Sequence, residues 1–393
     1  MAKRTMMYVC PFCCKTVDRA RSHYACDNTD CTARFIEKAV GTQKRMRVSI
    51  YRPGEEVDVE ASVYAHIDPT SPNAITTPKH ITYHSKDRKC DICHRPASQE
   101  LCPFCHGPIP DDSDRGSNII AVLGASKSGK SHYTASLIEV LQSAYCAEYG
   151  ARMTSAVPRT DEVFDILRDR LREGDDKVPC TSEPMVYYIS RSEGDVVRTH
   201  TLAFFDTAAA DLESEGRMQA VSTGNLVAGA AGLLFLVDPL SFPKVRELLR
   251  LPPAPSVDYA GRLNEIADTI LLRNHLHRKN VDIPLAVVLT KVDALMHTAP
   301  EPEADSILFG PESSINIPRA RGLYDENNLM QISVEVEEYL RRIAGQDFIN
   351  AVDRFRPHAY FAASALGHEA SPHSIPAPFR VEDPMIWMMN RRK

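Results

Sequence analysis

A glycine-rich segment, GASKSGKS, occupies residues 124–131 and combines the residue types that bind phosphate groups. Glycine lets a backbone pass close to an anion, and the N–H groups at the start of a following helix face that anion. Lys130 is long enough to reach the β- and γ-phosphates of a nucleotide, and the Ser131 hydroxyl is a suitable ligand for Mg²⁺. The predicted phosphate-binding residues are Gly124, Ala125, Ser126, Lys127, Ser128, Gly129, Lys130, Ser131 and His132.

An aspartate, Asp206, ends the apolar segment HTLAFFD at 200–206. Proteins with a phosphate-binding loop use a carboxylate at the end of such a strand to hold Mg²⁺, usually through water. The competing interpretation is an aspartate that only begins a turn. Because the glycine-rich segment lies upstream, we assign Asp206 to a magnesium site.

A third motif, Thr290-Lys291-Val292-Asp293, follows the apolar residues 283–289 and could recognise a base. Guanine presents two adjacent donors, N1–H and the 2-amino group, and one carboxylate can accept both. Adenine has an acceptor at N1 and no 2-amino group, so it would leave that carboxylate unpaired. We therefore predict that Asp293 reads guanine, that Lys291 lies along the base plane, and that the ligand is GTP or GDP.

Nine of the eleven cysteines fall within residues 10–105, and in a reducing compartment such clustering indicates metal binding rather than disulfides. A C-x2-C turn directs two thiolates to one point, and two turns complete a tetrahedron around zinc. Cys14 could replace Cys13, and His23 is a further alternative ligand. Four thiolates leave no position for water, so both predicted sites are structural. Taken in chain order, the two sites are Cys10, Cys13, Cys26 and Cys31, and then Cys90, Cys93, Cys102 and Cys105.

Short apolar segments indicate the strands that must position these residues, and uninterrupted runs of this kind are typical of buried parallel strands. A helix is expected directly after the glycine-rich segment, at 131–145, because it lacks Gly and Pro. Further helices are expected at 161–174, within 241–280 and at 327–346. The predicted strands are at 119–123, 200–206, 231–238, 283–293 and 357–367.

These elements predict an α/β fold, with a mostly parallel sheet flanked by helices, over residues 117–370. Residues 1–110 are expected to hold two zinc-ribbon modules with a β-rich segment between them. Residues 371–393 form a C-terminal tail that either docks on the domain or contacts a partner.

The motifs together resemble the small-GTPase-like proteins of the TRAFAC class, over roughly residues 117–367. The resemblance implies a P-loop NTPase fold and hydrolysis of GTP to GDP and phosphate, with Mg²⁺. It implies that Ser364, Ala365 and Leu366 support the base, with the Ala365 N–H facing guanine O6. The class also has a threonine that binds Mg²⁺ and senses the γ-phosphate; Thr181 is the candidate, and Thr154 and Thr160 are alternatives.

This sequence differs from the pattern of the class at residues 206–210, which read DTAAA. The class has D-x-x-G there, followed in many members by glutamine. Ala209 replaces the glycine, although its N–H can still donate to the γ-phosphate. Ala210 stands in the glutamine position, and a methyl group cannot orient water. We therefore expect hydrolysis that is slow or depends on a partner's arginine.

Zinc ribbons ahead of such a domain resemble the bacterial double-GTPase group. This resemblance implies a molecular switch with protein partners, in a multi-protein signalling or defence system. One alternative is a scaffold that binds GTP without hydrolysing it. Another is a nucleic-acid-dependent NTPase that uses residues 1–50, where ten Lys/Arg outnumber four Asp/Glu although the whole chain has a net charge of −6. Basic and aromatic residues do not interleave there strongly enough to argue for nucleic-acid binding, so this alternative is the weaker one.

Composition is that of a soluble globular protein, with 43% hydrophobic and 25% charged residues. No apolar run reaches 18 residues, and the first residues lack the apolar core of a signal peptide. We expect a cytoplasmic location and no membrane contact.

Overall fold

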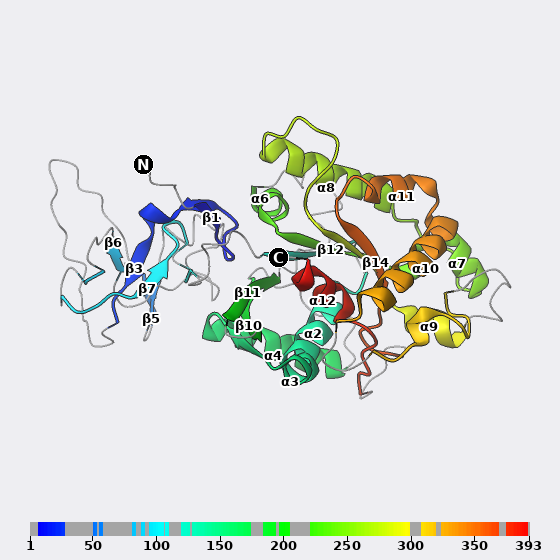
Figure 1. Cartoon of the computed structure of the whole chain (residues 1–393), viewed down its shortest axis with the longest axis horizontal. Helices are drawn as coiled ribbons and strands as arrows, with labels where there is room; N and C mark the ends of the chain where they lie inside the picture. Colours follow the sequence, from blue (N-terminus) through cyan, green and yellow to red (C-terminus); the bar gives the residue numbers. More distant parts are fainter. Residues whose placement is uncertain are drawn as a thin grey trace. The chain divides into compact units, whose positions relative to one another are not determined.

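The computed structural model divides the chain into two compact units, residues 1–117 and 118–393 (Figure 1). Within the described residues, no helix combines the length and apolarity needed to cross a membrane. The structure describes residues 7–27, 50–52, 55–57, 81–83, 88–90, 94–105, 107–109, 119–125, 128–173, 184–193, 196–204, 221–298, 308–319, 324–368 and 375–391.

The first unit is built from short antiparallel strands. The central strand β3 pairs with both β6 and β7, while β1 pairs with β2 and β4 pairs with β5. A small apolar cluster of Tyr8, Val17 and Ile109 packs against buried cysteines. A core of this size stabilises a fold only weakly, so cross-links are expected. The strands are β1 (Met7–Val9), β2 (Thr16–Asp18), β3 (His23–Ala25), β4 (Ile50–Arg52), β5 (Glu55–Val57), β6 (Ile81–Tyr83) and β7 (Gln99–Leu101).

The second unit contains a four-stranded parallel sheet in the order β14-β13-β12-β8. Every residue of β8, β12 and β13 is buried, which explains why these strands are continuous apolar runs. The unit therefore has the mixed α/β fold that the sequence predicts. The strands are β8 (Ile120–Gly124), β12 (Gly232–Val237), β13 (Leu285–Leu289) and β14 (His358–Ala362).

A separate antiparallel sheet, in the order β11-β10-β9, differs from the sequence prediction. It consists of β9 (Ala151–Ser155), β10 (Met185–Glu193) and β11 (Val196–Phe204). Strands β10 and β11 pair along their full length, from Met185↔Phe204 to Glu193↔Val196. Only two residues separate these strands, and so short a connection allows only antiparallel pairing. The strand expected at 200–206 is thus the second half of a hairpin.

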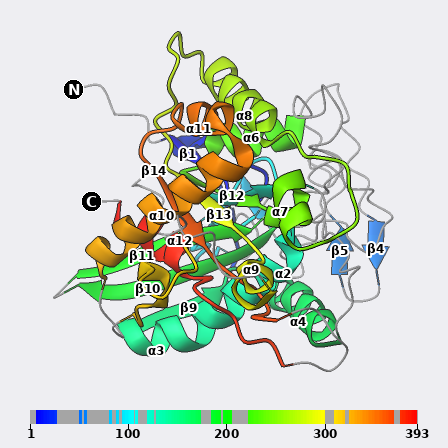
Figure 2. The same ribbon diagram turned by 90° about the vertical axis from the view of Figure 1, so that its right-hand side faces the viewer.

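Helices cover both faces of the parallel sheet (Figure 2). Val122, Leu236 and Val288 belong to the core shared with helices α2 and α12. On the opposite face, the ring of Phe235 contacts Tyr259 of α8, which contacts Phe348 of α11. The helices are α2 (Lys130–Val140), α3 (Cys146–Tyr149), α4 (Pro158–Glu173), α6 (Val221–Gly229), α7 (Pro243–Leu248), α8 (Tyr259–Arg273), α9 (Val292–Thr298), α10 (Glu326–Ala344), α11 (Gln346–Val352) and α12 (Asp383–Asn390), with a π-helical stretch at Leu141–Tyr145.

The C-terminal segment packs into this core. Trp387 of α12 is 1% exposed and its ring meets Phe361 of β14. The Tyr133 hydroxyl donates to the Val381 carbonyl at 2.8 Å. A side chain added at Gly232 would collide with Met388, because its Cβ would lie 2.5 Å from the sulfur. Helix α12 is therefore an integral layer of the second unit.

Trp387→Ala is expected to lower the free energy of unfolding of the second unit by about 3–5 kcal/mol, because it leaves a large cavity between α12 and the sheet. The measurement is urea unfolding followed by far-UV circular dichroism. The matched control is Ile375→Ala in the same C-terminal segment, where the side chain is 86% exposed; its effect should stay within about 0.5 kcal/mol. Equal effects of the two substitutions would contradict this packing.

Candidate functional site

The glycine-rich loop joins the end of β8 to the start of α2. Gly129 adopts φ +82° immediately before the helix, in the left-handed region that favours glycine. A Cβ at Gly124 would lie 2.6 Å from the Ser128 hydroxyl, so the loop closes on itself too tightly for a larger residue. The Lys130 ammonium donates to the carbonyls of Gly124 and Ala125, both at 3.0 Å, and the residue is 8% exposed. The loop thus holds a buried cation beside the helix N-terminus.

Thr290 connects this loop to the end of β13. Its hydroxyl lies 3.1 Å from the Ser128 carbonyl and 3.2 Å from the Val237 carbonyl, the two acceptors it can serve. The Thr290 N–H donates to Val237 at 2.9 Å. One buried threonine therefore fixes the glycine-rich loop against the ends of β12 and β13.

Lys291 follows in the left-handed region, at φ +52°. Its ammonium lies 2.7 Å from Asp238 Oδ2, and Asp238 also accepts from the Leu240 N–H at 2.8 Å. A Cβ placed on Gly129 would be 3.9 Å from Lys291 Cε, so the lysine stem passes beside the loop. The Tyr259 hydroxyl accepts a hydrogen bond from the Asp238 N–H at 3.0 Å and so holds the backbone that carries this carboxylate.

Asp293 lies in the first turn of α9 and accepts a hydrogen bond from the Ser364 hydroxyl at 2.5 Å. Ser364 follows β14, and its hydroxyl also accepts the Gly367 N–H at 2.8 Å. The next residue, Ala365, accepts from the Ser136 hydroxyl of α2 at 2.8 Å. The segment that carries Asp293 is therefore held by Ser364 after β14, and the segment after β14 is held in turn by the helix that follows the glycine-rich loop.

These contacts gather the ends of four parallel strands at one edge of the sheet, where open α/β sheets bind ligands. The structure brings together three segments that are distant in sequence, which carry Lys130, then Thr290 and Asp293, and then Ser364. Ser131 and His132 lie in the first turn of α2. Leu366 is partly buried and packs against the core. Five predicted residues of this site lie outside the described ranges: Ser126, Lys127, Thr181, Asp206 and Ala209.

Asp238 was not among the sequence candidates. The signal was present, because the apolar run at 231–237 ends in an acid at the carboxyl edge of the sheet. The sequence does not show which residue pairs with Asp238, because its partner Lys291 is 53 residues away. The contact makes Asp238 a positioning residue for the lysine.

On the sequence-based expectation that this site binds guanine nucleotides, Asp238→Ala should weaken GTP and GDP binding equally, by roughly 3- to 10-fold, because Lys291 loses the charged partner that holds it. The affinities are measured by isothermal titration calorimetry. In a Lys291→Ala background, Asp238→Ala should have little further effect, because the interaction is already absent. Full additivity of the two substitutions would show that Asp238 does not act through Lys291.

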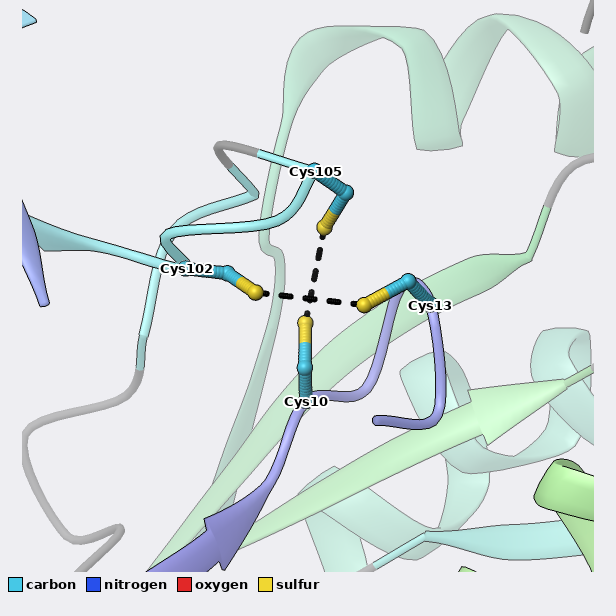
Figure 3. Close-up of side chains that lie close together, drawn as sticks. All are labelled: Cys10, Cys13, Cys102 and Cys105. Carbon is cyan, nitrogen blue, oxygen red and sulfur yellow. Dashed lines mark hydrogen bonds between the residues drawn. The ribbon is translucent and has the colours of Figure 1, made fainter. Parts of the chain in front are cut away.

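A second candidate site is formed by four cysteines of the first unit (Figure 3). The sulfurs of Cys10, Cys13, Cys102 and Cys105 all lie within 4.8 Å of one another. Cys10 and Cys105 are 3.6 Å apart, and Cys13 and Cys102 are 3.8 Å apart. A tetrahedron with Zn–S bonds of about 2.3 Å has sulfurs about 3.8 Å apart. This donor set could therefore hold a zinc ion.

Backbone hydrogen bonds shape the turns that carry these cysteines. The Cys10 N–H donates to Lys15 at 3.0 Å, and the Cys14 N–H donates back to Cys10 at 2.9 Å. The Cys102 N–H donates to Gly107 at 2.9 Å. Cys14 adopts φ +56° and is not in the cluster, so Cys13 is the member of that pair that faces the site.

The composition of this cluster differs from the chain-order prediction. Cys102 and Cys105 take the places expected for Cys26 and Cys31 beside the first C-x2-C turn. Strand pairing separates Cys26 from Cys102: β3 and β7 are antiparallel, so Cys26, which follows Ala25, and Cys102, which follows Leu101, lie at opposite ends of the ladder. His23 is likewise outside the cluster. Cys31 and Cys93 lie outside the described residues.

Comparison with known proteins finds similarity to a curated protein and to solved structures, among them the following. SaeC of Mycolicibacterium smegmatis, for which a role as an ESX-1 scaffolding and assembly protein has been proposed, is 28% identical over 317 residues, covering 74% of this chain and 79% of SaeC. Sup35 complexed with GDP is 13% identical with a TM-score of 0.22, covering 63% of this chain and 36% of that one.

The GTPase-like domain of Saccharomyces cerevisiae Ski7, bound to GTP, is 14% identical with a TM-score of 0.30. It covers 70% of this chain and 50% of the Ski7 chain, so this protein spans about a third to a half of the two solved structures. No family model matches the sequence.

Proposed function

We propose that residues 118–393 bind GTP or GDP with Mg²⁺ and act as a slow or partner-activated GTPase switch. The convergence of the glycine-rich loop with Asp293 and Ser364 at one sheet edge carries this proposal. Thr290 joins the phosphate end to the base end by its proximity to Ser128. A nucleotide lying along this edge would meet a cation at one end and a carboxylate at the other.

Recognition of guanine rests on Asp293. Its Oδ1 accepts the Ser364 hydroxyl, which orients the carboxylate. Carboxylate oxygens have further lone pairs, so the group can still accept both N1–H and the 2-amino group. The Lys291 stem, held by Asp238, would lie along the base plane, and the Ala365 N–H would face guanine O6.

At the phosphate end, Lys130 would exchange the carbonyls of Gly124 and Ala125 for the β- and γ-phosphates. Ser131, Asp206 and Thr181 would hold Mg²⁺, which supplies positive charge against the charge that develops during phosphoryl transfer. The backbone N–H of Ala209 would donate to the γ-phosphate. Loss of that phosphate would release the segments around Thr181 and Ala209, which is the proposed switch.

Water attack on the γ-phosphate has no evident orienting side chain at position 210, where alanine replaces the glutamine of the resembled class. We therefore assign slow unaided turnover and activation by a protein partner. The named role of SaeC in scaffolding and assembly favours protein partners for this chain as well.

The test is single-turnover hydrolysis of GTP by zinc-loaded protein, with ATP in parallel. Loss of GTP without loss of ATP supports a guanine-specific hydrolase. Equal binding of ATP and GTP would overturn the assignment of Asp293.

A second function, a GTP-bound scaffold without hydrolysis, is favoured by the alanines at 208–210 and by the scaffolding role proposed for SaeC. It predicts tight GTP binding with no phosphate release over hours. Adding candidate partners distinguishes the two functions. A switch should release phosphate faster when its activator is present, whereas a scaffold should release none.

A further inference from the structure

The turn that begins at Cys90 has the same backbone design as the turn at Cys10. The Cys90 N–H donates to Arg95 at 2.8 Å, and the His94 N–H donates back to Cys90 at 3.1 Å. His94 adopts φ +55°, as Cys14 does at φ +56° in the equivalent position. Cys90 is 0% exposed, again like Cys10. At Cys10 this turn directs thiolates to the four-cysteine cluster, yet Cys90 is not part of that cluster.

The pairing of β3 with β7 places Cys26 and Cys102 at opposite ends of one β-ladder. Strands β3 and β7 run antiparallel, with His23 opposite Leu101 and Ala25 opposite Gln99. The cluster cysteine Cys102 follows Leu101 at one end. Cys26 follows Ala25 at the other end, where the chain enters β7 from the Cys90 turn.

Three hydrogen bonds hold the residue after Cys26 against that turn. The Asp27 N–H donates to the Pro96 carbonyl at 3.0 Å. The Asp27 carboxylate accepts from the N–H and hydroxyl of Ser98, at 2.8 and 2.9 Å.

Within the turn itself, the Ala97 N–H donates to Arg88 at 2.8 Å, and Lys89 bridges Pro96. The segment that carries Cys26 is thus tied to the β-turn that carries Cys90.

We propose that Cys26 and Cys90 are ligands of a second structural zinc ion at this end of the ladder. Four thiolates complete such a site. The other two ligands are assigned from sequence alone, because they lie outside the described residues. They are Cys93, which forms a C-x2-C pair with Cys90, and Cys31, which forms a C-x4-C pair with Cys26. The two sites are then nested along the chain. The first and last cysteine pairs, Cys10/Cys13 and Cys102/Cys105, bind one ion, and the two middle pairs, Cys26/Cys31 and Cys90/Cys93, bind the other.

Nesting gives the first unit a metal cross-link at each end of β3 and β7. The only apolar pair clustered on that ladder is Ala25 with Leu101, among the described residues. Zinc coordination commonly supplies the folding energy that such a short segment lacks. This inference concerns the first unit and does not depend on the proposed GTPase function.

The first test measures zinc per full-length chain by mass spectrometry of the metal. Wild type should hold about two ions, and Cys26→Ser/Cys90→Ser should retain about one, because both changes fall in one site. Cys13→Ser/Cys26→Ser should lose both ions, because it damages each site. Chain-order pairing predicts the reverse for these two double variants, and that result would overturn nesting.

The second test uses the wild-type protein, so it remains informative where a variant fails to fold. Zinc is removed slowly with a chelator, and the alkylation rate of each cysteine is followed by peptide mass spectrometry. Cys26, Cys31, Cys90 and Cys93 should react with one shared rate, distinct from that of Cys10, Cys13, Cys102 and Cys105. Reaction of Cys26 and Cys90 in zinc-loaded protein, as fast as Cys146 of α3, would exclude the second site.

Discussion

Asp293→Asn is expected to weaken GTP binding by about 10²- to 10⁴-fold. The carboxylate would accept two hydrogen bonds from guanine, each worth roughly 1.5–3 kcal/mol when one partner is charged. An amide presents one donor and one acceptor, so one of the two guanine donors would face an N–H group. Xanthine has a carbonyl in place of the 2-amino group, so xanthosine triphosphate should bind the variant better than GTP does. The measurement is titration of both nucleotides with Mg²⁺.

The matched control is Asp347→Asn, since Asp347 also lies in the first turn of a seven-residue helix but is exposed. It should leave both affinities unchanged. If Asp293→Asn lowers the affinities for GTP and xanthosine triphosphate equally, the carboxylate acts on the fold of the loop and not on the base. Circular dichroism of both variants tests the remaining explanation, loss of folded protein.

Removal of zinc is expected to unfold the first unit while the second unit keeps its structure. Structural zinc sites contribute apparent binding free energies of about 10–16 kcal/mol to folding. The apolar cluster around Tyr8, Val17 and Ile109 is too small to replace that contribution. Hydrogen exchange followed by mass spectrometry should show at least about 10-fold faster exchange in β1, β2 and β7 after chelation. Exchange in β12 and β13 should not change.

Cys102→Ser should reproduce much of this effect without a chelator, because it removes one ligand from the four-cysteine cluster. Cys146→Ser is the control, because Cys146 belongs to α3 of the second unit and is not a member of the cluster. Restored protection on adding Zn²⁺ back to the wild type would show that the change is reversible metal loss. Unchanged exchange after complete zinc removal would mean that the cluster does not hold the unit together.

Local features of the second unit could be predicted from the sequence. The parallel strands are short apolar runs because both faces of the sheet are covered. The structure places β12, β13 and β14 within the expected segments, and β8 ends one residue later than expected. The long helix at α10 and the helix after the glycine-rich loop follow from residues that favour helix without interruption. Antiparallel β9, β10 and β11 were not predicted as one sheet, because apolar periodicity identifies a strand but not its partner.

The sequence by itself determined which residue types carry chemistry and how each local turn is shaped. The spacing of Cys10 and Cys13, the glycine at position 129 and the order Thr290 to Asp293 all act within a few residues. Only the tertiary structure decided which distant turns meet. Pairing of β3 with β7 puts Cys26 and Cys102 at opposite ends of the ladder, Cys102 joins the cluster of Cys10, and the sheet edge brings Asp238 to Lys291. The physical reason is that side-chain spacing constrains neighbours along the chain, whereas contacts across tens of residues depend on strand order and register.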